Sequence, residues 1–424
     1  MKIAIVSNGV IWIPLKTFQI FKKYLSNVNE ITLFTTDFNV LKFLSNGIVY
    51  ASNPEELVNK IKEYSPDIIQ INRPVTPFTL TDKILRSKIS PVVEYLYLTR
   101  WDYLSKYFIH HVSPSSFLIR ELFIKKNLPV EILKKFSIIP YHIDVDLIDD
   151  ARTNNVTKIK QELAPHNELL IGFLSGPDRG KTNNPIFAKI LYSIYKKLKK
   201  IKIIAIGGLT NDFKSRVWEL INKDILVDAG PMYGTMLYEY LHALDLFVYY
   251  SLIGETFGIA IAEAMATGLP VVINGTPYRT NAQTLLVDNG KDGFVANSIK
   301  GFVDVVIYLA KNESLREKFG SNAKIKIHTK YHPKDTTEKM ITLYEKIIKN
   351  ERIDNNLSLT SINNEFKEKC HNVFDRGKKY AFYYYTTYYQ MRVVNVGGHI
   401  KAIKKIVESS SQKIMKLIYD GWTS

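Results

Sequence analysis

Short apolar runs alternate with helical patterns along the first 350 residues of the chain. Asn53 and Pro54 begin one such helix, and Leu57, Ile61 and Tyr64 form its apolar face. Strands that alternate with helices predict a parallel sheet covered by helices. In the N-terminal part we predict strands at residues 2–7, 31–35, 67–71, 91–95 and 109–112.

The same alternation begins again after a polar stretch at residues 149–155. It predicts a helix at 185–199, a last helix at about 335–349, and strands at 169–174, 201–206, 224–227, 246–249 and 270–273. Two doubly wound α/β domains in tandem leave a cleft at the carboxyl ends of their strands, where ligands commonly bind. We therefore expect an N-terminal domain at 1–148, a C-terminal domain at 149–330, and a helix at 331–349 that returns toward the first domain.

Residues 350–424 form an extension of different character. The extension is polar to about residue 369, and tyrosines then cluster at residues 380–389. Residues 399–419 set isoleucines and a leucine against lysines, which predicts a basic amphipathic helix. Such a helix either packs on the body of the protein with a solvated lysine face or contacts a membrane surface.

Charge and cysteine content limit the partners and the compartment. The net charge of +16 fits nucleic acid, an anionic membrane surface or a negatively charged small substrate. A single cysteine, Cys370, excludes an internal disulfide framework and a cysteine-based metal site. Asn8 and Gly9 interrupt the apolar start, and no apolar run reaches the roughly 18 residues that span a bilayer. These features predict a cytoplasmic protein.

The segment at residues 254–272 carries the chemistry. Glu263 is the only charged residue in a predicted helix of isoleucine, alanine and methionine, so we expect it to be buried and to need a partner. Ligand hydroxyls and a structural salt bridge are the two alternatives. Gly254 and Gly258 bracket the turn that starts this helix, and Glu255 lies in the same turn. Backbone N–H groups at a helix start attract anions, and glycine lets a phosphate approach closely.

This segment resembles the donor-binding signature of the retaining family called glycosyl transferases group 1, E-x-F-G-x-x-x-x-E-A-M-A-x-G-x-P-V-V. Every fixed position is matched from Glu255 to Val272. The resemblance extends over about residues 1–349 and is strongest at 169–300. It implies the GT-B fold, an α/β architecture of two Rossmann-like doubly wound domains facing a cleft, here with a C-terminal helical extension. Further similar stretches are residues 138–144 (the interdomain hinge), 227–231, 243–251 and 293–295.

The resemblance implies a nucleotide-sugar donor site in the C-terminal domain. By position, Glu263 binds the ribose hydroxyls and Glu255 reaches the hydroxyls of the transferred sugar. Backbone N–H groups of Thr256, Phe257 and Gly258, in the turn after Gly254, hold the distal phosphate or the sugar. Met232 is placed to meet the base through its backbone, and Gly9 is the contact from the N-terminal domain to the phosphates.

The resemblance also implies a reaction without a metal ion or a resident cofactor. The family keeps an arginine and a lysine after the first strand of the second domain to neutralise the departing diphosphate. Here residues 175–181 offer Arg179 and Lys181, and a solvated basic loop is the alternative. The implied reaction transfers a sugar to an acceptor hydroxyl with retention of configuration. Asp144-Val145-Asp146 lies at the hinge and is expected to cap the following segment instead of binding a metal.

The first domain departs from the family pattern. The family has a glycine pair after the first strand, and this chain has only Asn8-Gly9. The family histidine after the fourth strand is missing, and Tyr97 takes its place with Arg100 nearby. His142 in the hinge is a substitute candidate, whereas His110 and His111 are expected to pack. Tyr97, Arg100 and His142 are thus the acceptor-side candidates.

The acceptor is expected to be a saccharide or a lipid-linked molecule. Two predicted helices suit docking to anionic lipid at the inner face of a membrane, and nucleic acid is not expected as a partner. One alternative is a catalytically degenerate GT-B-like protein that binds nucleic acid or an anionic membrane surface, although such a binder has no use for two carboxylates in a cleft. Another is a nucleotide-sugar epimerase or a phosphorylase on the same scaffold. The basic residues on the two helices are Lys16, Lys22 and Lys23, and Lys125, Lys126, Lys134 and Lys135.

Overall fold

The computed structural model describes residues 1–8, 12–25, 29–39, 47–73, 76–176, 181–276 and 280–371, without the side chains of residues 12–14 and 371. All of these described residues belong to one compact unit. The tyrosine cluster at 380–389 and the helix predicted at 399–419 therefore lie outside the described residues. None of the helices in the described part of the chain is long and apolar enough to cross a membrane.

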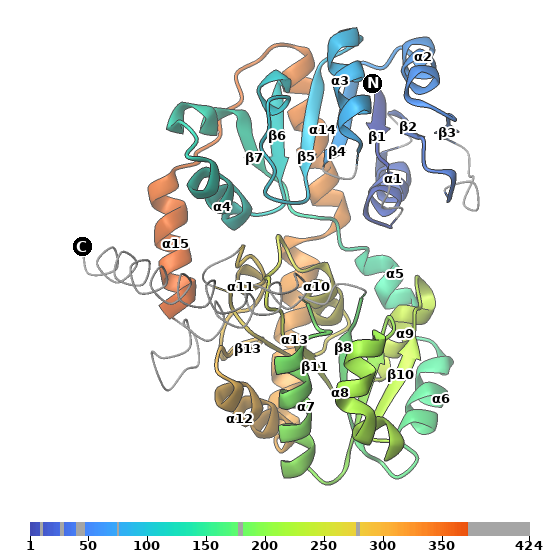
Figure 1. The fold of residues 1–424 in the computed structure, drawn as a ribbon, viewed down its shortest axis with the longest axis vertical. Coiled ribbons are helices and arrows are strands. Elements are labelled where there is room, and N and C mark those ends of the chain that lie inside the picture. Colours follow the sequence, from blue (N-terminus) through green and yellow to red (C-terminus); the bar gives the residue numbers. More distant parts are fainter. Residues whose placement is uncertain are drawn as a thin grey trace, which may run out of the picture. The chain divides into compact units, whose positions relative to one another are not determined.

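The N-terminal domain contains a parallel seven-stranded sheet in the order β3-β2-β1-β4-β5-β6-β7 (Figure 1). The five strands expected from sequence are present, each within two residues of its predicted bounds. β3 and β7, of three residues each, were not expected from the sequence. The strands are β1 (Lys2–Val6), β2 (Glu30–Thr35), β3 (Ile48–Tyr50), β4 (Ile68–Arg73), β5 (Val92–Leu96), β6 (His110–Ser113) and β7 (Phe136–Ile138).

Helices cover this sheet and are capped as their sequences require. The Asn53 side chain accepts a hydrogen bond from the Glu56 N–H group at the start of α2 (Pro54–Tyr64), as predicted. Ser115 does the same for the Leu118 N–H group at the start of α4. The other helical elements are α1 (Trp12–Leu25), α3 (Phe78–Ser87), α4 (Ser116–Lys126) and two short 3₁₀ helices, η2 (Ser105–Tyr107) and η3 (Val130–Lys135).

The C-terminal domain contains a parallel six-stranded sheet in the order β10-β9-β8-β11-β12-β13. The strand predicted at 224–227 is misplaced at its start, because Asp224 adopts a left-handed turn (φ 55°) after α8 and pairing begins at Leu226. The strands are β8 (Leu169–Leu174), β9 (Ile201–Ile206), β10 (Leu226–Gly230), β11 (Leu246–Tyr249), β12 (Val271–Ile273) and β13 (Gly293–Val295).

The helices of this domain follow its strands in alternation, as expected for a doubly wound unit. Asp144 caps the helix after the hinge by accepting from the Leu147 N–H group, so the expected capping role is confirmed. These helices are α5 (Val145–Asp150), α6 (Asn154–Leu163), α7 (Pro185–Lys197), α8 (Asn211–Asn222), α9 (Thr235–Ala243), α10 (Ile259–Ala266), α11 (Gln283–Leu286), α12 (Ile299–Ala310) and α13 (Glu313–Lys330).

Two further helices tie the end of the described chain to the N-terminal domain. α14 (Pro333–Ile348) contacts α1, and the Tyr344 hydroxyl donates to the Gln70 side chain on β4. α15 (Leu359–His371) packs on α4, where Phe366 lies 4.9 Å from the ring of Phe117. The Arg120 guanidinium covers the other part of the Phe366 ring, 3.7 Å from its centroid. The first part of the extension is therefore an integral packing element.

The carboxyl ends of the two sheets are joined by contacts. Ser115, after β6, donates a 2.6 Å hydrogen bond to the carbonyl oxygen of Thr256, after β11. The Tyr141 ring meets Phe257 edge-on with centroids 5.5 Å apart. These contacts place the segment singled out in the sequence against the N-terminal domain.

Gly320 on α13 supports the helix that carries Glu263, and we expect Gly320→Ala to destabilise the protein. A Cβ at this position lies 2.0 Å from the carbonyl oxygen of Gly268, just after α10. Alanine gains about 1 kcal/mol of helix propensity, but overpacking against backbone costs about 1–3 kcal/mol. Urea denaturation measures the change in unfolding free energy, with exposed Ser321→Ala as the matched control. A Gly320→Ala protein more stable than wild type contradicts this packing.

Candidate functional site

The turn between β11 and α10 requires its glycines. Gly254 has a φ of 71°, and a Cβ there lies 2.3 Å from both Thr276 Oγ1 and the Thr280 carbonyl oxygen. Gly258 has a φ of 105° and immediately precedes α10. Both positions therefore require glycine, at Gly254 because the neighbouring chain packs against the turn and at both because φ is positive.

Three backbone N–H groups are available at this turn. Within the described parts of the chain, no hydrogen-bond acceptor is found for the N–H groups of Thr256, Phe257 or Gly258. They lie at the start of α10, where the partial positive charge of the helix adds to them. This arrangement suits a phosphate or a sugar oxygen.

Glu255 is held in place by three neighbours. The Tyr249 hydroxyl donates to Oε1 at 2.5 Å, and the Lys181 ammonium lies 3.1 Å from both carboxylate oxygens. The Glu255 N–H group donates to the Gln283 side chain at 3.0 Å. The side chain of Glu255 is 11% exposed, so its carboxylate is pre-oriented and largely shielded from water.

Glu263 is buried, at 6% exposure, and it is paired. The Lys16 ammonium, from α1 of the N-terminal domain, forms an ion pair with Oε1 of Glu263. The Tyr238 hydroxyl on α9 donates to the same oxygen at 3.0 Å, and Lys16 donates to the Tyr238 oxygen at 2.9 Å. Of the two alternatives for Glu263, the structure contains the salt bridge, and it joins the two domains.

The remaining donor-side candidates are distributed differently. Met232 is 5% exposed and belongs to the same core cluster as Tyr238, in the segment before α9. Arg179 and Gly9 lie outside the described residues. The structure thus brings together Glu255, Lys181 and the turn residues, and it leaves the roles given to them as predictions.

The acceptor-side candidates do not form one cluster. Tyr97 is 6% exposed and stacks on Tyr141 with centroids 5.5 Å apart. Arg100 is one-third exposed, and its Nε donates to Asp102 at 2.9 Å. His142 is buried, with Nδ1 2.6 Å from Thr336 Oγ1. Burial, together with the nearby Lys16, lowers the pKa of His142 to about 3, so its imidazole is neutral near pH 7.

A buried charged network behind Arg100 was not foreseen from sequence. Arg73 lies 3.2 Å from Glu94 and also pairs with Asp102 at 2.5 Å. Glu94 contacts His111 Nδ1 at 2.5 Å, which confirms that His111 has a packed, structural place. The signal in the sequence was weak, because each of these residues looks like an isolated charge in its own strand or loop.

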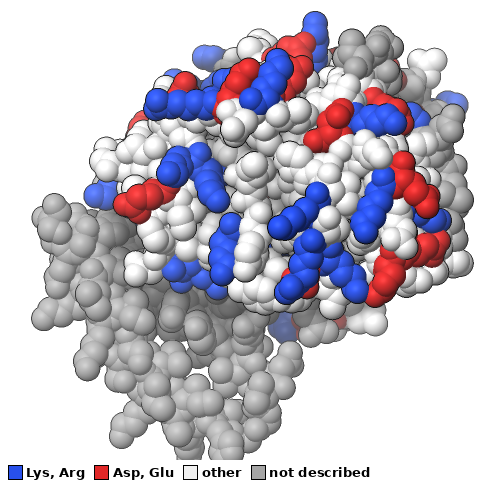
Figure 2. All heavy atoms as spheres, turned by 90° about the horizontal axis from the view of Figure 1, so that it is seen from above, with Lys and Arg blue, Asp and Glu red and all other residues white. Residues whose placement is uncertain are grey.

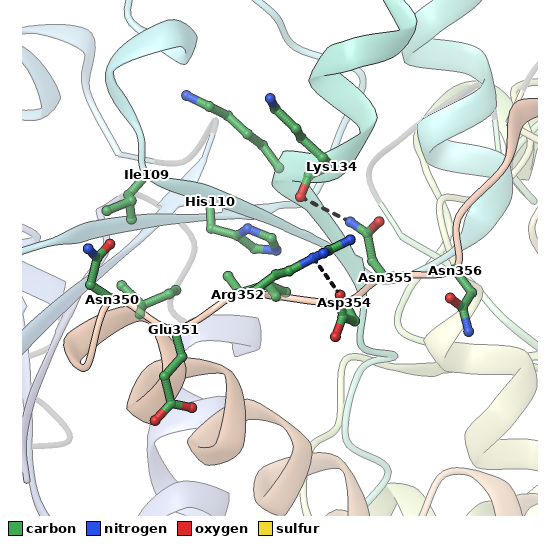
Figure 3. Close-up of a pocket in the computed structure, with 12 residues that line it drawn as sticks. Ile109, His110, Lys134, Asn350, Glu351, Arg352, Asp354, Asn355 and Asn356 are labelled. Atoms are coloured by element: carbon green, nitrogen blue, oxygen red, sulfur yellow. Dashed lines mark hydrogen bonds and ion pairs between the residues drawn. The ribbon is translucent and has the colours of Figure 1, made fainter.

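A pocket of about 670 Å³ lies away from the signature turn (Figure 3). It opens at the amino ends of β6 and β7, whereas the turn contacts Ser115, at the carboxyl end of β6. His110 lines it, with Nε2 2.9 Å from Ser137 Oγ, and burial lowers the pKa of His110 to about 3. Asn355 donates to the Lys134 carbonyl oxygen at 3.1 Å and closes one side. The packed role expected for His110 is confirmed.

Metal binding requires several ligands in one place. No group of three or more histidine, cysteine, aspartate or glutamate side chains with suitable geometry is found within the residues that the structure describes. That the reaction needs no metal ion stays a prediction.

Comparisons with known proteins find similarity in the C-terminal domain and in the fold. Residues 165–326 match the family model described as glycosyl transferases group 1. Alpha-monoglucosyldiacylglycerol synthase of Streptococcus pneumoniae is 30% identical over 90 residues. This match spans 21% of this chain and only 20% of that protein's length.

Two solved structures share the fold. A glycosyltransferase from Rickettsia africae superimposes with a TM-score of 0.69 at 16% identity, covering 82% of this chain and 99% of that one. HepE from Anabaena, in complex with UDP and glucose, gives 0.67 at 16% identity, with 81% and 99% covered. The expected fold class is therefore confirmed: the chain has the GT-B fold, and residues 165–326 of its C-terminal domain match the glycosyl transferases group 1 family.

Proposed function

We propose that this protein transfers a sugar from a nucleotide-diphosphate sugar to an acceptor hydroxyl, with retention of configuration and without a metal ion. The observation that carries the proposal is the Glu255–Lys181 pair at the turn at 254–258, which begins the helix that carries the buried Glu263. Two oriented carboxylates recognise hydroxyl groups, and the turn offers N–H donors to an anion. An epimerase or a phosphorylase has no comparable support in the described site.

The parts of the site have separate roles in this proposal. Glu263 accepts from the ribose hydroxyls and Glu255 from the transferred sugar. The N–H groups of the turn hold the distal phosphate, and Lys181 neutralises the charge that develops on the departing diphosphate. Charge stabilisation by a fixed cation in a largely dry site accounts for much of the rate of such reactions. Because HepE was solved with UDP and glucose, UDP-glucose is the first donor to test.

The acceptor is proposed to be a saccharide or a lipid-linked molecule, reached by peripheral contact with an anionic membrane. On α4 and η3, Ile124 and Val130 are each 60% exposed, and Lys126 and Lys134 of the same two elements are exposed as well. Apolar side chains among lysines suit an anionic lipid surface. Figure 2 shows lysine and arginine side chains across the face that carries the amino ends of the first sheet, with acidic side chains between several of them.

The helix α1 does not belong to this surface. Lys16 is paired with Glu263, and Lys23 lies 3.3 Å from Asp144 and 3.1 Å from Asp146. The expectation that Lys16 faces lipid headgroups is therefore wrong, because Glu263 holds its ammonium group across the domain boundary. For Lys23, which is half exposed, the expectation stays a prediction.

Donor binding is tested on Glu263. We expect Glu263→Gln to weaken binding of UDP-glucose by roughly tenfold or more, since a charged hydrogen-bond acceptor is lost. Isothermal titration calorimetry measures the dissociation constant. Glu239→Gln, in the same domain, is the control, because Glu239 is also buried but bonds Thr153 and Asn155. If the wild-type protein binds none of a panel of UDP-, GDP- and ADP-sugars, the proposed function is wrong.

Leaving-group stabilisation is tested on Lys181. Lys181→Met is expected to lower kcat by about a hundredfold while changing donor affinity less, because the charge acts on the departing diphosphate. Release of nucleoside diphosphate measures the rate, and EDTA is expected to leave it unchanged. Lys197→Met, which removes a surface pair with Asp304, is the control. Loss of activity in EDTA contradicts the metal-independent mechanism.

Membrane contact is tested with vesicles. The protein is expected to sediment with phosphatidylglycerol vesicles at low salt, to be released at roughly 0.5 M salt, and to ignore neutral phosphatidylcholine vesicles. The double variant Lys126→Glu and Lys134→Glu should lose this binding, while Lys62→Glu on α2 should keep it. If the double variant sediments with the vesicles as fully as Lys62→Glu does, the membrane contact lies elsewhere on the protein.

A further inference from the structure

Lys16 connects the N-terminal domain to the carboxylate that is central to the donor site. Its side chain is 29% exposed, and the Glu263 side chain is 8% exposed. Three bonds form a closed triangle between the Lys16 ammonium, the Tyr238 hydroxyl and Glu263 Oε1. The triangle contains one positive and one negative charge, so it is electrically balanced while the domains are in contact.

The triangle depends on this domain arrangement. Tyr238 and Glu263 belong to α9 and α10 of the same domain and remain neighbours if the domains separate, whereas Lys16 leaves with α1. Burial by itself lowers the pKa of Lys16, but Glu263 and Tyr238 outweigh burial and raise it above its ordinary value. The ammonium is therefore charged whenever this contact exists, and the partly apolar surroundings strengthen its attraction to Glu263.

The triangle uses only one of the two carboxylate oxygens. Lys16 and Tyr238 both donate to Oε1, and no hydrogen bond to Oε2 is found from any of the described residues. An ionised carboxylate has about four acceptor positions over its two oxygens. Oε2 is thus left for a ligand, and Lys16 need not leave for a hydroxyl group to bind.

We propose that Lys16 is a positioning residue of the donor site, which holds the Glu263 carboxylate from the opposite domain so that Oε2 faces the ribose hydroxyls of the donor. The inference rests on the proposed function, and it adds to the donor site a residue of the N-terminal domain. Its consequence is that ribose recognition and contact between the two domains stabilise one another, since both use the same carboxylate.

The neighbours of Lys16 fit this role. His142 is kept neutral by burial and by Lys16, so it does not compete for Glu263 as a second cation. Phe21, one turn further along α1, packs edge-on against His142 with centroids 5.3 Å apart and fixes the helix that carries Lys16. The backbone that carries the Lys16 side chain is therefore fixed by packing, which limits where the ammonium group can lie relative to Glu263.

The test compares ligands with and without ribose hydroxyls. Wild-type protein, Lys16→Met and Lys16→Arg are titrated with UDP, GDP and ADP and with the 2′,3′-dideoxy form of each. In the wild type, the preferred diphosphate should bind about tenfold better than its dideoxy form. Lys16→Met should reduce this ratio to about two or less, Lys16→Arg should restore most of it, and the surface variant Lys62→Met should leave it unchanged. The double variant Lys16→Met with Glu263→Gln should show the same affinity ratio as the Glu263→Gln single variant, because both substitutions act through one contact.

The other outcomes separate the two proposals. If Lys16→Met weakens the normal and dideoxy ligands equally, Lys16 acts on the diphosphate or on stability, and the inference is overturned. If Lys16→Met binds the normal diphosphate more tightly than wild type, the ammonium occupies the ribose position and must be displaced, which also overturns it. If the wild-type protein binds none of the diphosphates, the proposed function fails, and the inference fails with it.

Discussion

A buried carboxylate on an apolar helix destabilises the fold unless hydrogen-bond donors or a positive charge surround it. Glu263 on α10 is such a carboxylate. Its partners come from both domains: Tyr238 from the neighbouring helix and Lys16 from α1. The packing of α13 on the turn after α10 fixes the helix itself, because Gly320 allows the backbones to approach closely. The burial of one charge thus links helix packing, domain contact and ligand recognition.

The surface that would bind a donor is also the surface on which the two domains meet. Ser115 bonds the Thr256 carbonyl oxygen, Tyr141 packs on Phe257, and Lys16 reaches Glu263. These three contacts involve the turn or the helix of the signature segment. If the proposed donor binds here, it binds against the same residues that hold the two domains together.

The N-terminal domain contributes structure in a different way. Arg73, at the carboxyl end of β4, pairs with Glu94 on β5 and with Asp102 in the loop after β5. Breaking such a buried network leaves an uncompensated charge, so it holds the loop after β5 in one conformation. The loop carries Arg100, which is one-third exposed and also pairs with Asp102.

Local features of the sequence were enough to determine the two α/β series, the glycine-bracketed turn and the isolation of Glu263 on its helix. Each depends on periodicity or on backbone conformation within a few residues, as Gly254 and Gly258 illustrate. The strands β3 and β7 are not apparent from the sequence, and the strand predicted from Asp224 begins too early, because the left-handed turn at Asp224 depends on the preceding helix. Only the tertiary structure decided that Lys16, 247 residues away, faces Glu263, and that Arg73, Glu94 and His111 meet in the core. Those pairings follow from how the sheets and domains pack, and no local pattern encodes them.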